Sequence, residues 1–167
     1  MAKVNNNDNN IKILISQNRK ASFSYELGDV YEGGLVLLGS EVKSLRVNKA
    51  NISDTHIAPT NHDDHSALYI FNLHIPDYDK ANIFKHYDKR PRKILLHRRE
   101  INKLRGLSQI KGFSLIPLKI YFNHKNLVKV LFAVGKGKKE YDKREAVKQR
   151  DWQRAKSRIL KQDMTEK

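Results

Sequence analysis

Short apolar runs separated by turn signals recur along residues 21–134, and this pattern limits the folds open to the chain. Residues 23–27 alternate apolar and polar side chains, which is the period of a strand with one buried face. A turn signal at Gly28-Asp29 precedes a second such run at residues 31–38, so the two runs predict a β-hairpin. Inside the second run, Gly33-Gly34 indicates a bulge, a bend or a close backbone approach, and we expect it to curve the sheet.

Further apolar runs and two helical patterns complete the expected fold. The helices are predicted from Glu41, with Ser40 as N-cap, and within residues 93–106, where Gly106 is a natural end. About six short strands with two short helices suit a small antiparallel barrel, because closure removes the exposed strand edges. We therefore predict a mainly β fold, a small OB-like antiparallel β-barrel whose later strands are residues 54–58, 68–75, 115–122 and 127–134.

The two ends of the chain differ from this central pattern. Residues 1–16 begin with a polar, Asn-rich stretch that cannot bury much apolar surface, so we expect a flexible leader. Residues 135–167 hold twelve Lys and Arg against six Asp and Glu, with a thin apolar stripe that includes Trp152. We expect this basic tail to be disordered when free and helical on a partner. The barrel then comprises residues 17–134.

The charge of the chain points to a polyanionic partner. Its 33 Lys and Arg against 18 Asp and Glu give a formal net charge of +15, which attracts phosphate. The basic residues gather at Lys89–Lys93, at Arg98–Arg105 and in the tail, a distribution that favours RNA or DNA binding. Unpaired RNA bases could stack on the nearby aromatic rings or on Trp152, although packing within the protein would explain the same residues: Tyr78, Phe84, His86 and Tyr87.

Patterns that would indicate other functions are weak. The absence of Cys excludes disulfide scaffolds, thiol nucleophiles and Cys-based zinc sites. His62 and His65 have a spacing that metal ligands can have, but their loop is polar and holds no further cluster, so we expect it to be solvated. We predict no metal, no cofactor and no enzymatic activity, with a metal-free ribonuclease as an alternative. No run reaches the roughly 18 apolar residues of a membrane span, and we expect a soluble, cytoplasmic protein.

Several longer motifs stand in a fixed order along the chain. They are Gln17–Ala21, Gly39–Arg46, Ala50–Asp54, Arg92–His97 followed by Arg99-Glu100, Pro117–Tyr121, and Gly137–Lys139 followed by Asp142–Arg144. Their sequences and order resemble the SsrA-binding protein (SmpB) family, the bacterial partner of transfer-messenger RNA, over nearly the whole chain. The resemblance implies an OB-like barrel that binds the tRNA-like domain of that RNA and delivers it to stalled ribosomes for trans-translation. It implies an adaptor without catalysis.

The resemblance also implies which residues bind RNA. In the family, the glutamate that corresponds to Glu41 and residues of the segment around Leu95 and His97 belong to the RNA-binding face, and Lys129 resembles a further contact. A carboxylate can accept from base and ribose donors, although Glu41 would also suit a helix N-terminus. The complete set expected against the tRNA-like domain is Asn18, Arg19, Lys20, Glu41, Lys43, Arg46, Arg92, Lys93, Leu95, His97, Lys129, Lys136, Lys138 and Lys139.

The tail has a separate implied role. By resemblance it enters the empty mRNA path of a stalled ribosome and touches ribosomal RNA through Tyr141, Asp142, Lys143, Arg144, Arg150 and Trp152. The alternative from charge alone is a general RNA chaperone or a ribosomal protein without preference for transfer-messenger RNA. We expect the protein to be a monomer when it is not bound to RNA.

Overall fold

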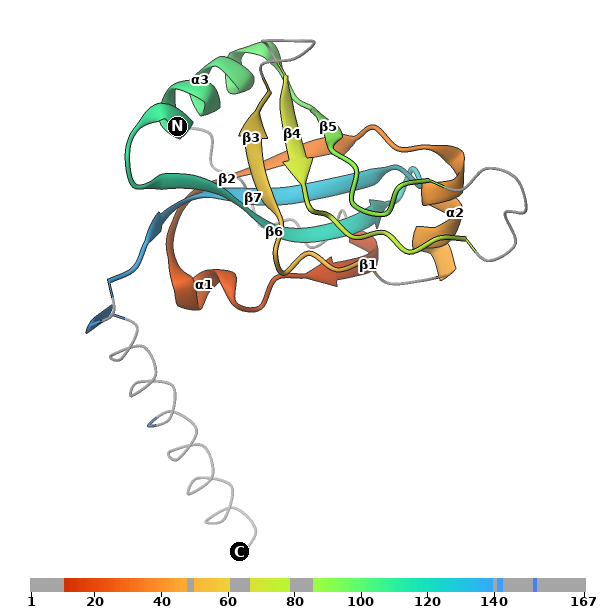
Figure 1. The fold of residues 1–167 in the computed structure, drawn as a ribbon, viewed down its shortest axis with the longest axis horizontal. Coiled ribbons are helices and arrows are strands. Elements are labelled where there is room, and N and C mark those ends of the chain that lie inside the picture. The colour runs from red at the N-terminus through yellow and green to blue at the C-terminus, as the bar shows by residue number, and fades with distance from the viewer. Residues whose placement is uncertain are drawn as a thin grey trace, which may run out of the picture.

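Antiparallel strands dominate the computed structural model, which describes residues 11–47, 50–60, 67–78, 86–139, 141–142 and 152. The strands alternate with short helices along the chain (Figure 1). The elements are β1 (Ile11–Gln17), α1 (Ala21–Ser24), β2 (Tyr25–Leu35), α2 (Gly39–Val47), β3 (His56–Pro59), β4 (Leu68–Phe71), β5 (Arg92–Leu95), α3 (Arg98–Gln109), β6 (Phe113–Asn123) and β7 (Val128–Gly137).

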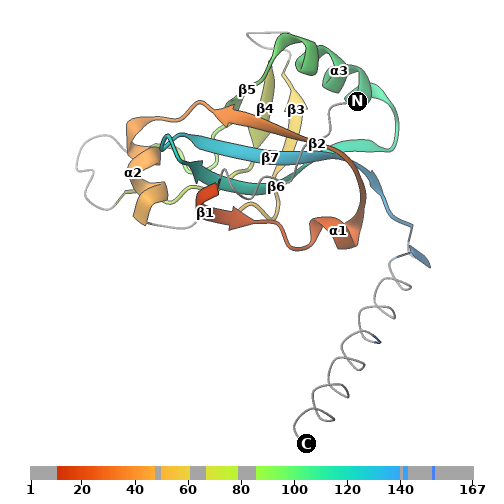
Figure 2. The same cartoon turned by 180° about the vertical axis from the view of Figure 1, so that it is seen from behind.

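The strand pairings close into a ring. Around the ring the order is β6-β3-β4-β5-β2-β7, and β7 pairs with β6 again. Every one of these pairs is antiparallel, and Figure 2 shows β7 running between β2 and β6. β1 pairs with the second half of β6, beyond the point where β3 meets Leu115. It is therefore an additional strand beside β6 and not one of the strands that close the ring. The prediction of a mainly antiparallel β fold is confirmed, and ring closure is what the barrel prediction requires.

Strand alternation fills the inside of the ring with apolar side chains. On β2, Tyr31 and Leu35 are buried, whereas Glu32 and Gly34 are half-buried on the outer face. Helix α2 contributes Leu45 to the core and α3 contributes Leu104. The large apolar strand residues that are at most 1% exposed are Leu68, Ile70, Ile94, Ile120, Val130 and Phe132. This core fixes which side chains remain for the outer surface.

The predicted hairpin across Gly28-Asp29 is wrong. Residues 25–35 form the single strand β2, and the register against β7 shifts between Leu27 and Val30. The Gly-Asp pair therefore marks an irregularity inside one strand, which a glycine accommodates as readily as it accommodates a turn. Phe23, expected to begin the hairpin, lies in the short helix α1.

Other predicted boundaries also change. Residues 11–16, assigned to the leader, belong to β1, while residues 1–10 lie outside the described residues. The helix predicted within residues 93–106 is divided: its first part is β5, and α3 starts at Arg98 and continues through Gly106 to Gln109. Seven strands are present in the described residues, one more than predicted. Helix α2 begins at Gly39, so Ser40 lies in its first turn and is not its N-cap.

The glycine at position 33 is required by packing rather than by curvature. A Cβ atom there would lie 2.5 Å from Cγ2 of Ile94 and 3.2 Å from the carbonyl oxygen of Leu95. No such contact can form without displacement, so β2 and β5 can approach each other only with glycine at this position. In the described part of the chain, none of the helices has the length and apolarity needed to cross a membrane.

Candidate RNA interface

The outer face of β5, β2 and β7 brings together two of the predicted RNA contacts. Gly34 on β2 is the register partner of Leu95 on one side and of Lys129 on the other. Leu95 is 55% exposed, and its side chain lies beside the position that a Cβ of Gly34 would take. Because Gly34 has no side chain, the backbone between Leu95 and Lys129 is uncovered. We call Glu32, Gly34, Leu95 and Lys129 the Gly34 surface.

The ammonium group of Lys129 is held in place from β2. Glu32 lies two residues before Gly34 on the same face, and its Oε1 is 3.4 Å from Lys129 Nζ. The other oxygen, Oε2, accepts a hydrogen bond of 2.6 Å from the hydroxyl of Tyr121 on β6. Burial and the hydrogen bond to Glu32 raise the pKa of Tyr121 above its usual range, so its hydroxyl remains a donor. The chain Tyr121–Glu32–Lys129 therefore fixes the cation of the Gly34 surface across three strands.

Glu32 was missed by sequence reasoning. It belongs to none of the motifs, and a lone glutamate in a basic chain is usually a solvated surface residue. The signal that could have found it is strand alternation, since Tyr31 and Leu35 point inward and place Glu32 and Gly34 together on the outer face.

Glu41 occupies a different environment from the one expected of an RNA contact. Its side chain is 0% exposed, as is that of Arg92. Its carboxylate accepts hydrogen bonds from Arg90 Nε at 2.9 Å, from Arg92 Nε at 2.8 Å and from the Leu38 amide at 2.7 Å. Burial pushes the pKa of Glu41 upward, but the bonds from Arg90 and Leu38 and the charge of Arg92 outweigh it, and the pKa falls below its usual value. Glu41 is therefore a buried carboxylate that stays ionised.

Arg92 connects this carboxylate to the backbone around it. Its Nη atoms donate to the carbonyl oxygens of Leu73, Asp88 and Arg90. Burial lowers the pKa of Arg92, and Glu41 opposes that change. The prediction of direct RNA contact by Glu41 and Arg92 does not fit the described structure, because neither side chain reaches the surface. Their geometry instead holds α2 against the segments that precede β5.

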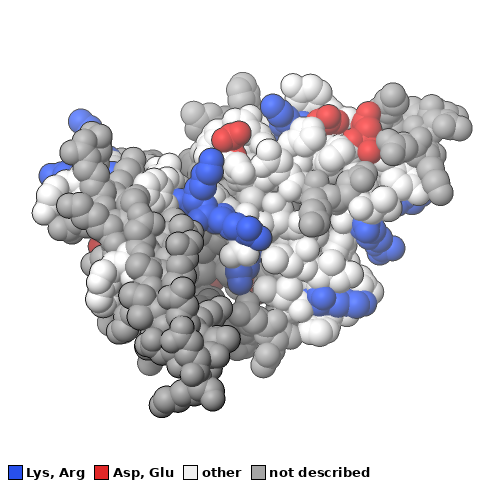
Figure 3. All heavy atoms as spheres, turned by 90° about the horizontal axis from the view of Figure 1, so that it is seen from below, with Lys and Arg blue, Asp and Glu red and all other residues white. Residues whose placement is uncertain are grey.

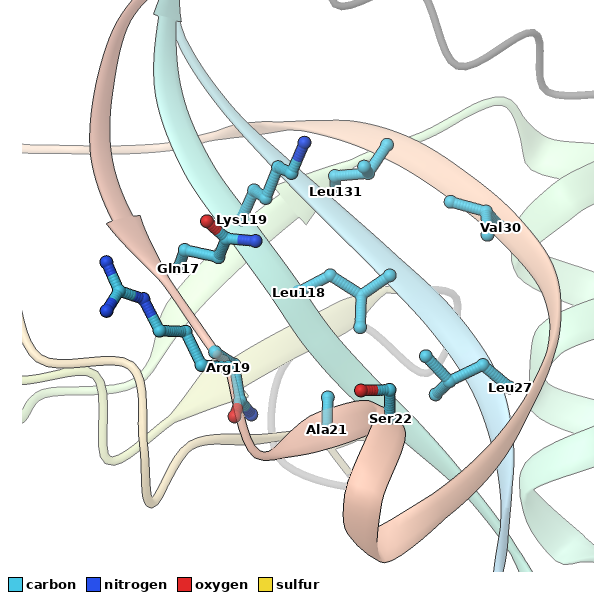
Figure 4. A pocket seen from close by; sticks show the side chains of 10 residues that line it. Gln17, Arg19, Ala21, Ser22, Leu27, Val30, Leu118, Lys119 and Leu131 are labelled. Atoms are coloured by element: carbon cyan, nitrogen blue, oxygen red, sulfur yellow. The ribbon is translucent and has the colours of Figure 1, made fainter. Parts of the chain in front are cut away.

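A hollow of about 500 Å³ lies next to the Gly34 surface on the β1, β6, β7 and β2 side. Figure 4 shows polar side chains along one of its sides and apolar ones over the rest. Arg19 lies in the turn before α1, where Asn18 accepts a 3.1 Å hydrogen bond from the Lys20 amide and donates to the Pro117 carbonyl at 3.3 Å. The remaining lining residues that matter here are Gln17, Leu27, Val30, Leu118, Lys119 and Leu131.

The other predicted barrel contacts are spread over several elements. Lys93 shares the outer face of β5 with Leu95, and His97 precedes α3, where its amide donates to Glu100. Lys43 and Arg46 are exposed on α2, at the end of the ring away from α1 (Figure 1). Figure 3 shows Lys and Arg spread over one face of the molecule, with Asp and Glu confined to a few places. The structure thus gathers Lys93, Leu95 and Lys129 on one face and places the α2 cations elsewhere.

The start of the tail lies beside α1. Lys136 and Lys139 are exposed, whereas Lys138 Nζ donates to the Ser22 carbonyl at 2.9 Å. The Lys139 amide donates to the Asp142 carboxylate at 3.2 Å. Tyr141 is 69% exposed and Trp152 is 66% exposed. Three further predicted tail contacts lie outside the described residues, namely Lys143, Arg144 and Arg150.

The aromatic and histidine candidates divide in the same way. Tyr87 is 74% exposed and Tyr78 is half-buried, while His86 is buried against the Ile75 carbonyl. Stacking on RNA therefore suits Tyr87 and does not suit His86. Phe84 and the pair His62 and His65 lie outside the described residues.

Comparison with known proteins gives one consistent result. The model of the family described as "SmpB protein" matches residues 15–162. An "SsrA-binding protein" of Methylorubrum populi is 51% identical over 89% of this chain and 92% of its own length, and one of Rickettsia bellii is 48% identical over 90% and 97%.

A chain from the solved structure "tmRNA-SmpB: a journey to the center of the bacterial ribosome" aligns with a TM-score of 0.61 and 39% identity. The alignment covers 79% of this chain and 93% of that chain. Sequence identity at this level over nearly full length, together with the shared fold, establishes that the chain belongs to the SmpB family.

Proposed function

We propose that this protein binds the tRNA-like domain of transfer-messenger RNA and delivers it to stalled ribosomes for trans-translation. Relatives of about 50% identity carry the name SsrA-binding protein, and the solved chain of similar fold comes from a complex of that RNA on the ribosome. The structural observation that supports the proposal at the level of single residues is the Gly34 surface, where Leu95 and Lys129 lie on either side of Gly34.

The chemistry of the Gly34 surface suits a folded RNA. Lys129 can contact a phosphate, which supplies affinity without sequence preference. The Glu32 carboxylate can accept from a base amino group or a ribose 2′-hydroxyl, and the exposed Leu95 side chain can pack on a sugar or base. Arg19, in the turn before α1 beside the hollow, adds a second cation. Selectivity then comes from the arrangement of these groups rather than from net charge.

The tail completes the proposal. Tyr141 and Trp152 are both exposed, as residues that dock on a partner must be. We place the tail segment from Tyr141 to Trp152 in the empty mRNA path of the stalled ribosome, where its cations meet ribosomal RNA. In this proposal the protein is a cytoplasmic adaptor, monomeric before it binds RNA, and it performs no catalysis itself.

Binding selectivity tests the proposal. Purified full-length protein is titrated with the isolated tRNA-like domain and with an unrelated hairpin of equal size, at two salt concentrations. We expect a preference for the tRNA-like domain that survives added salt, because nonspecific phosphate binding falls steeply with ionic strength. Equal binding to the two RNAs would instead support a general RNA chaperone, which the cations spread over several elements would suit.

Two variants connect the preference to the Gly34 surface. Lys129→Ala removes the cation of the Gly34 surface, and Leu95→Ala removes its apolar contact. Each is expected to lower the affinity for the tRNA-like domain more than the affinity for the hairpin. Lys111→Ala is the matched control, since Lys111 is an exposed lysine in the turn after α3. If Lys111→Ala weakened binding as much as Lys129→Ala, the interface would be electrostatic and not localised on the Gly34 surface.

A further inference from the structure

Acidic and histidine side chains within the segment that joins β4 to β5 converge on one place. One potential ligand atom from each of Asp77, His86 and Asp88 lies within 4.8 Å of the other two. His74 stands next to them, with its Nε2 3.5 Å from Asp88 Oδ2. We call Asp77, His86 and Asp88 the Asp-His-Asp cluster. It shares no residue with the Gly34 surface.

His86 is aimed into the cluster from a buried position. The residue is 7% exposed, and its side chain only 1%. Its Nε2 lies 3.1 Å from the Ile75 carbonyl oxygen. Because a carbonyl oxygen only accepts, Nε2 carries the proton, and in neutral imidazole Nδ1 then presents a lone pair.

That lone pair faces another acceptor. His86 Nδ1 is 3.9 Å from Asp77 Oδ1, which is too far for a hydrogen bond. Neither atom has a hydrogen-bond partner in the described structure, although both are buried. Buried acceptors without partners are costly, and two that face each other also repel. A cation between them would satisfy both.

We propose that the Asp-His-Asp cluster binds a divalent transition metal ion of the Zn²⁺ type. His86 Nδ1 and the carboxylates of Asp77 and Asp88 are the ligands, and His74 positions Asp88 from outside. Imidazole and carboxylate together suit Zn²⁺. The Nε2–H bond to the Ile75 carbonyl is the arrangement that usually orients a ligating histidine.

The spacing is compatible with one ion. Zn–N and Zn–O bonds of about 2.0–2.2 Å place two ligand atoms of a tetrahedral ion about 3.4 Å apart. The 3.9 Å between His86 Nδ1 and Asp77 Oδ1 is slightly longer, and a small movement of the Asp77 side chain would close the difference. The Asp88 carboxylate completes the set by a small side-chain movement. A hollow of about 390 Å³, lined by Asn51, Asp54, Asn72, His74 and Lys89, lies on the His74 side of the cluster.

An ion at this place would join two segments that the buried arginine also holds. The Ile75 amide donates to the Asp88 carbonyl at 3.1 Å, and Arg92 donates to the same oxygen at 2.9 Å. A metal bridge from Asp77 to Asp88 would add a side-chain link beside these backbone bonds. Since the ion binds the folded state, it should stabilise that state by RT ln(1 + c/Kd), where c is the free Zn²⁺ concentration, so the stabilisation grows with the logarithm of c above Kd.

The test uses the full chain without an affinity tag, freed of metal by a chelator. Zn²⁺ is titrated in by calorimetry, and Tm is followed with and without Zn²⁺. We expect one ion per chain and a rise in Tm. Asp77→Asn is expected to weaken binding more than about 100-fold, because the loss of an outer-shell partner alone usually costs about 10–100-fold, and to abolish the rise in Tm. His86→Gln should do the same while its amide nitrogen can still donate to the Ile75 carbonyl.

Two controls assign the binding to this cluster. The double variant His62→Gln with His65→Gln removes the other histidine pair, and His56→Gln removes an exposed histidine of β3. Both should retain the affinity of the unmodified protein. Cobalt(II) in place of Zn²⁺ should give a visible absorption band that Asp77→Asn loses.

Several outcomes would overturn the proposal. No saturable heat and no change in Tm would mean that the Asp-His-Asp cluster binds no metal ion. Unchanged affinity in Asp77→Asn, or loss of affinity in the His62 and His65 double variant, would place the ion elsewhere. If circular dichroism shows that His86→Gln does not fold, Asp77→Asn decides the question, because the Asp77 side chain is 38% exposed and less important for packing.

Discussion

The Glu41 carboxylate accepts hydrogen bonds from two arginines and a backbone amide while its side chain is fully buried. Removing its charge would leave Arg92 buried without a counter-ion. We therefore expect Glu41→Gln to lower the free energy of unfolding by about 3 kcal/mol, as for other broken buried ion pairs. Urea denaturation measures this, with Glu26→Gln as an exposed control that should be nearly neutral.

The same variant separates a structural role from direct RNA contact. Under conditions where Glu41→Gln is folded, its affinity for the tRNA-like domain should stay close to that of the unmodified protein. A stable, folded variant that lost RNA binding would show that the carboxylate contacts RNA after all.

The lowered pKa of Glu41 also predicts a pH dependence. The folded state holds this carboxylate ionised to lower pH than the unfolded chain, whose value is near 4.5. The stabilisation from Glu41 is thus fully present above pH 4.5 and is lost as pH falls through the lower folded value. Urea denaturation is measured between about pH 6 and pH 3, because pKa values of carboxyl groups in folded proteins vary by about one unit. As the pH falls, the free energy of unfolding should decrease more steeply for the unmodified protein than for Glu41→Gln. Parallel curves would contradict this linkage.

Single residues were predictable from the sequence only where local pattern decides their role. Leu95 and Lys129, which the resemblance implied as RNA contacts, lie on the outer face of the ring, and their contact with RNA stays a prediction. Glu41 does not lie there, because its burial depends on Arg90 and Arg92, which stand 49 and 51 residues later in the chain. Strand alternation could have placed Glu32 on the outer face, but its contacts were missed for the same reason, since its partners Tyr121 and Lys129 come from strands far along the sequence.

At the scale of elements, Gly33 is the glycine where an added Cβ would come closest to a neighbouring strand. Gly33→Ala would place its methyl group 2.5 Å from Cγ2 of Ile94, so β2 and β5 must separate. We expect a loss of about 1–3 kcal/mol in the free energy of unfolding, as for overpacked cores. Chemical denaturation checks this value.

A second glycine supplies the control. Gly106 lies inside α3, and a Cβ there meets nothing within 4 Å. Gly106→Ala should raise the free energy of unfolding by about 0.5–1 kcal/mol, because alanine loses less backbone entropy in a helix. If both substitutions had the same sign, the close approach of β2 and β5 would not be what requires Gly33.

Element types were easier to predict than element boundaries, and the errors have physical causes. Gly28-Asp29 has the composition of a turn, but β7 runs along the whole of β2 and keeps the strand continuous through the register shift. Leu95 and Leu96 fit a helical spacing with Ile101, yet Arg92–Leu95 pairs with β4 and β2 and so becomes β5. Tertiary pairing overrode local preference in both cases.

At the scale of the whole molecule, the ring closes without residues 138–167, because residues 135–137 of the expected tail belong to β7. The core residues run from Ile15 to Val134, and the pairing of β6 with β7 that completes the ring ends at Lys136. Alternation in the sequence predicted antiparallel strands, but their order around the ring rests on long-range pairings that no local pattern encodes. The ring is therefore expected to fold and bind RNA independently of residues 145–167.

Deleting residues 145–167 should separate the two proposed activities of the protein. We expect Tm and the affinity for the tRNA-like domain to change little, because the Gly34 surface and the core lie before the deletion. Peptide tagging of stalled ribosomes in a reconstituted translation system should be lost, because Trp152 and the cations around it are removed. A Trp152→Ala variant tests whether removing the indole side chain of Trp152 is enough to cause that loss of tagging.

The readouts distinguish the failure of one part from the failure of the other. Tagging that survived the deletion would exclude the tail from ribosome rescue while leaving RNA binding intact. A fall in Tm would mean instead that the tail covers part of the ring, as an amphipathic residue such as Trp152 can. Loss of affinity for the tRNA-like domain with unchanged Tm would place part of the RNA interface in the tail and reduce the share assigned to Lys129 and Leu95.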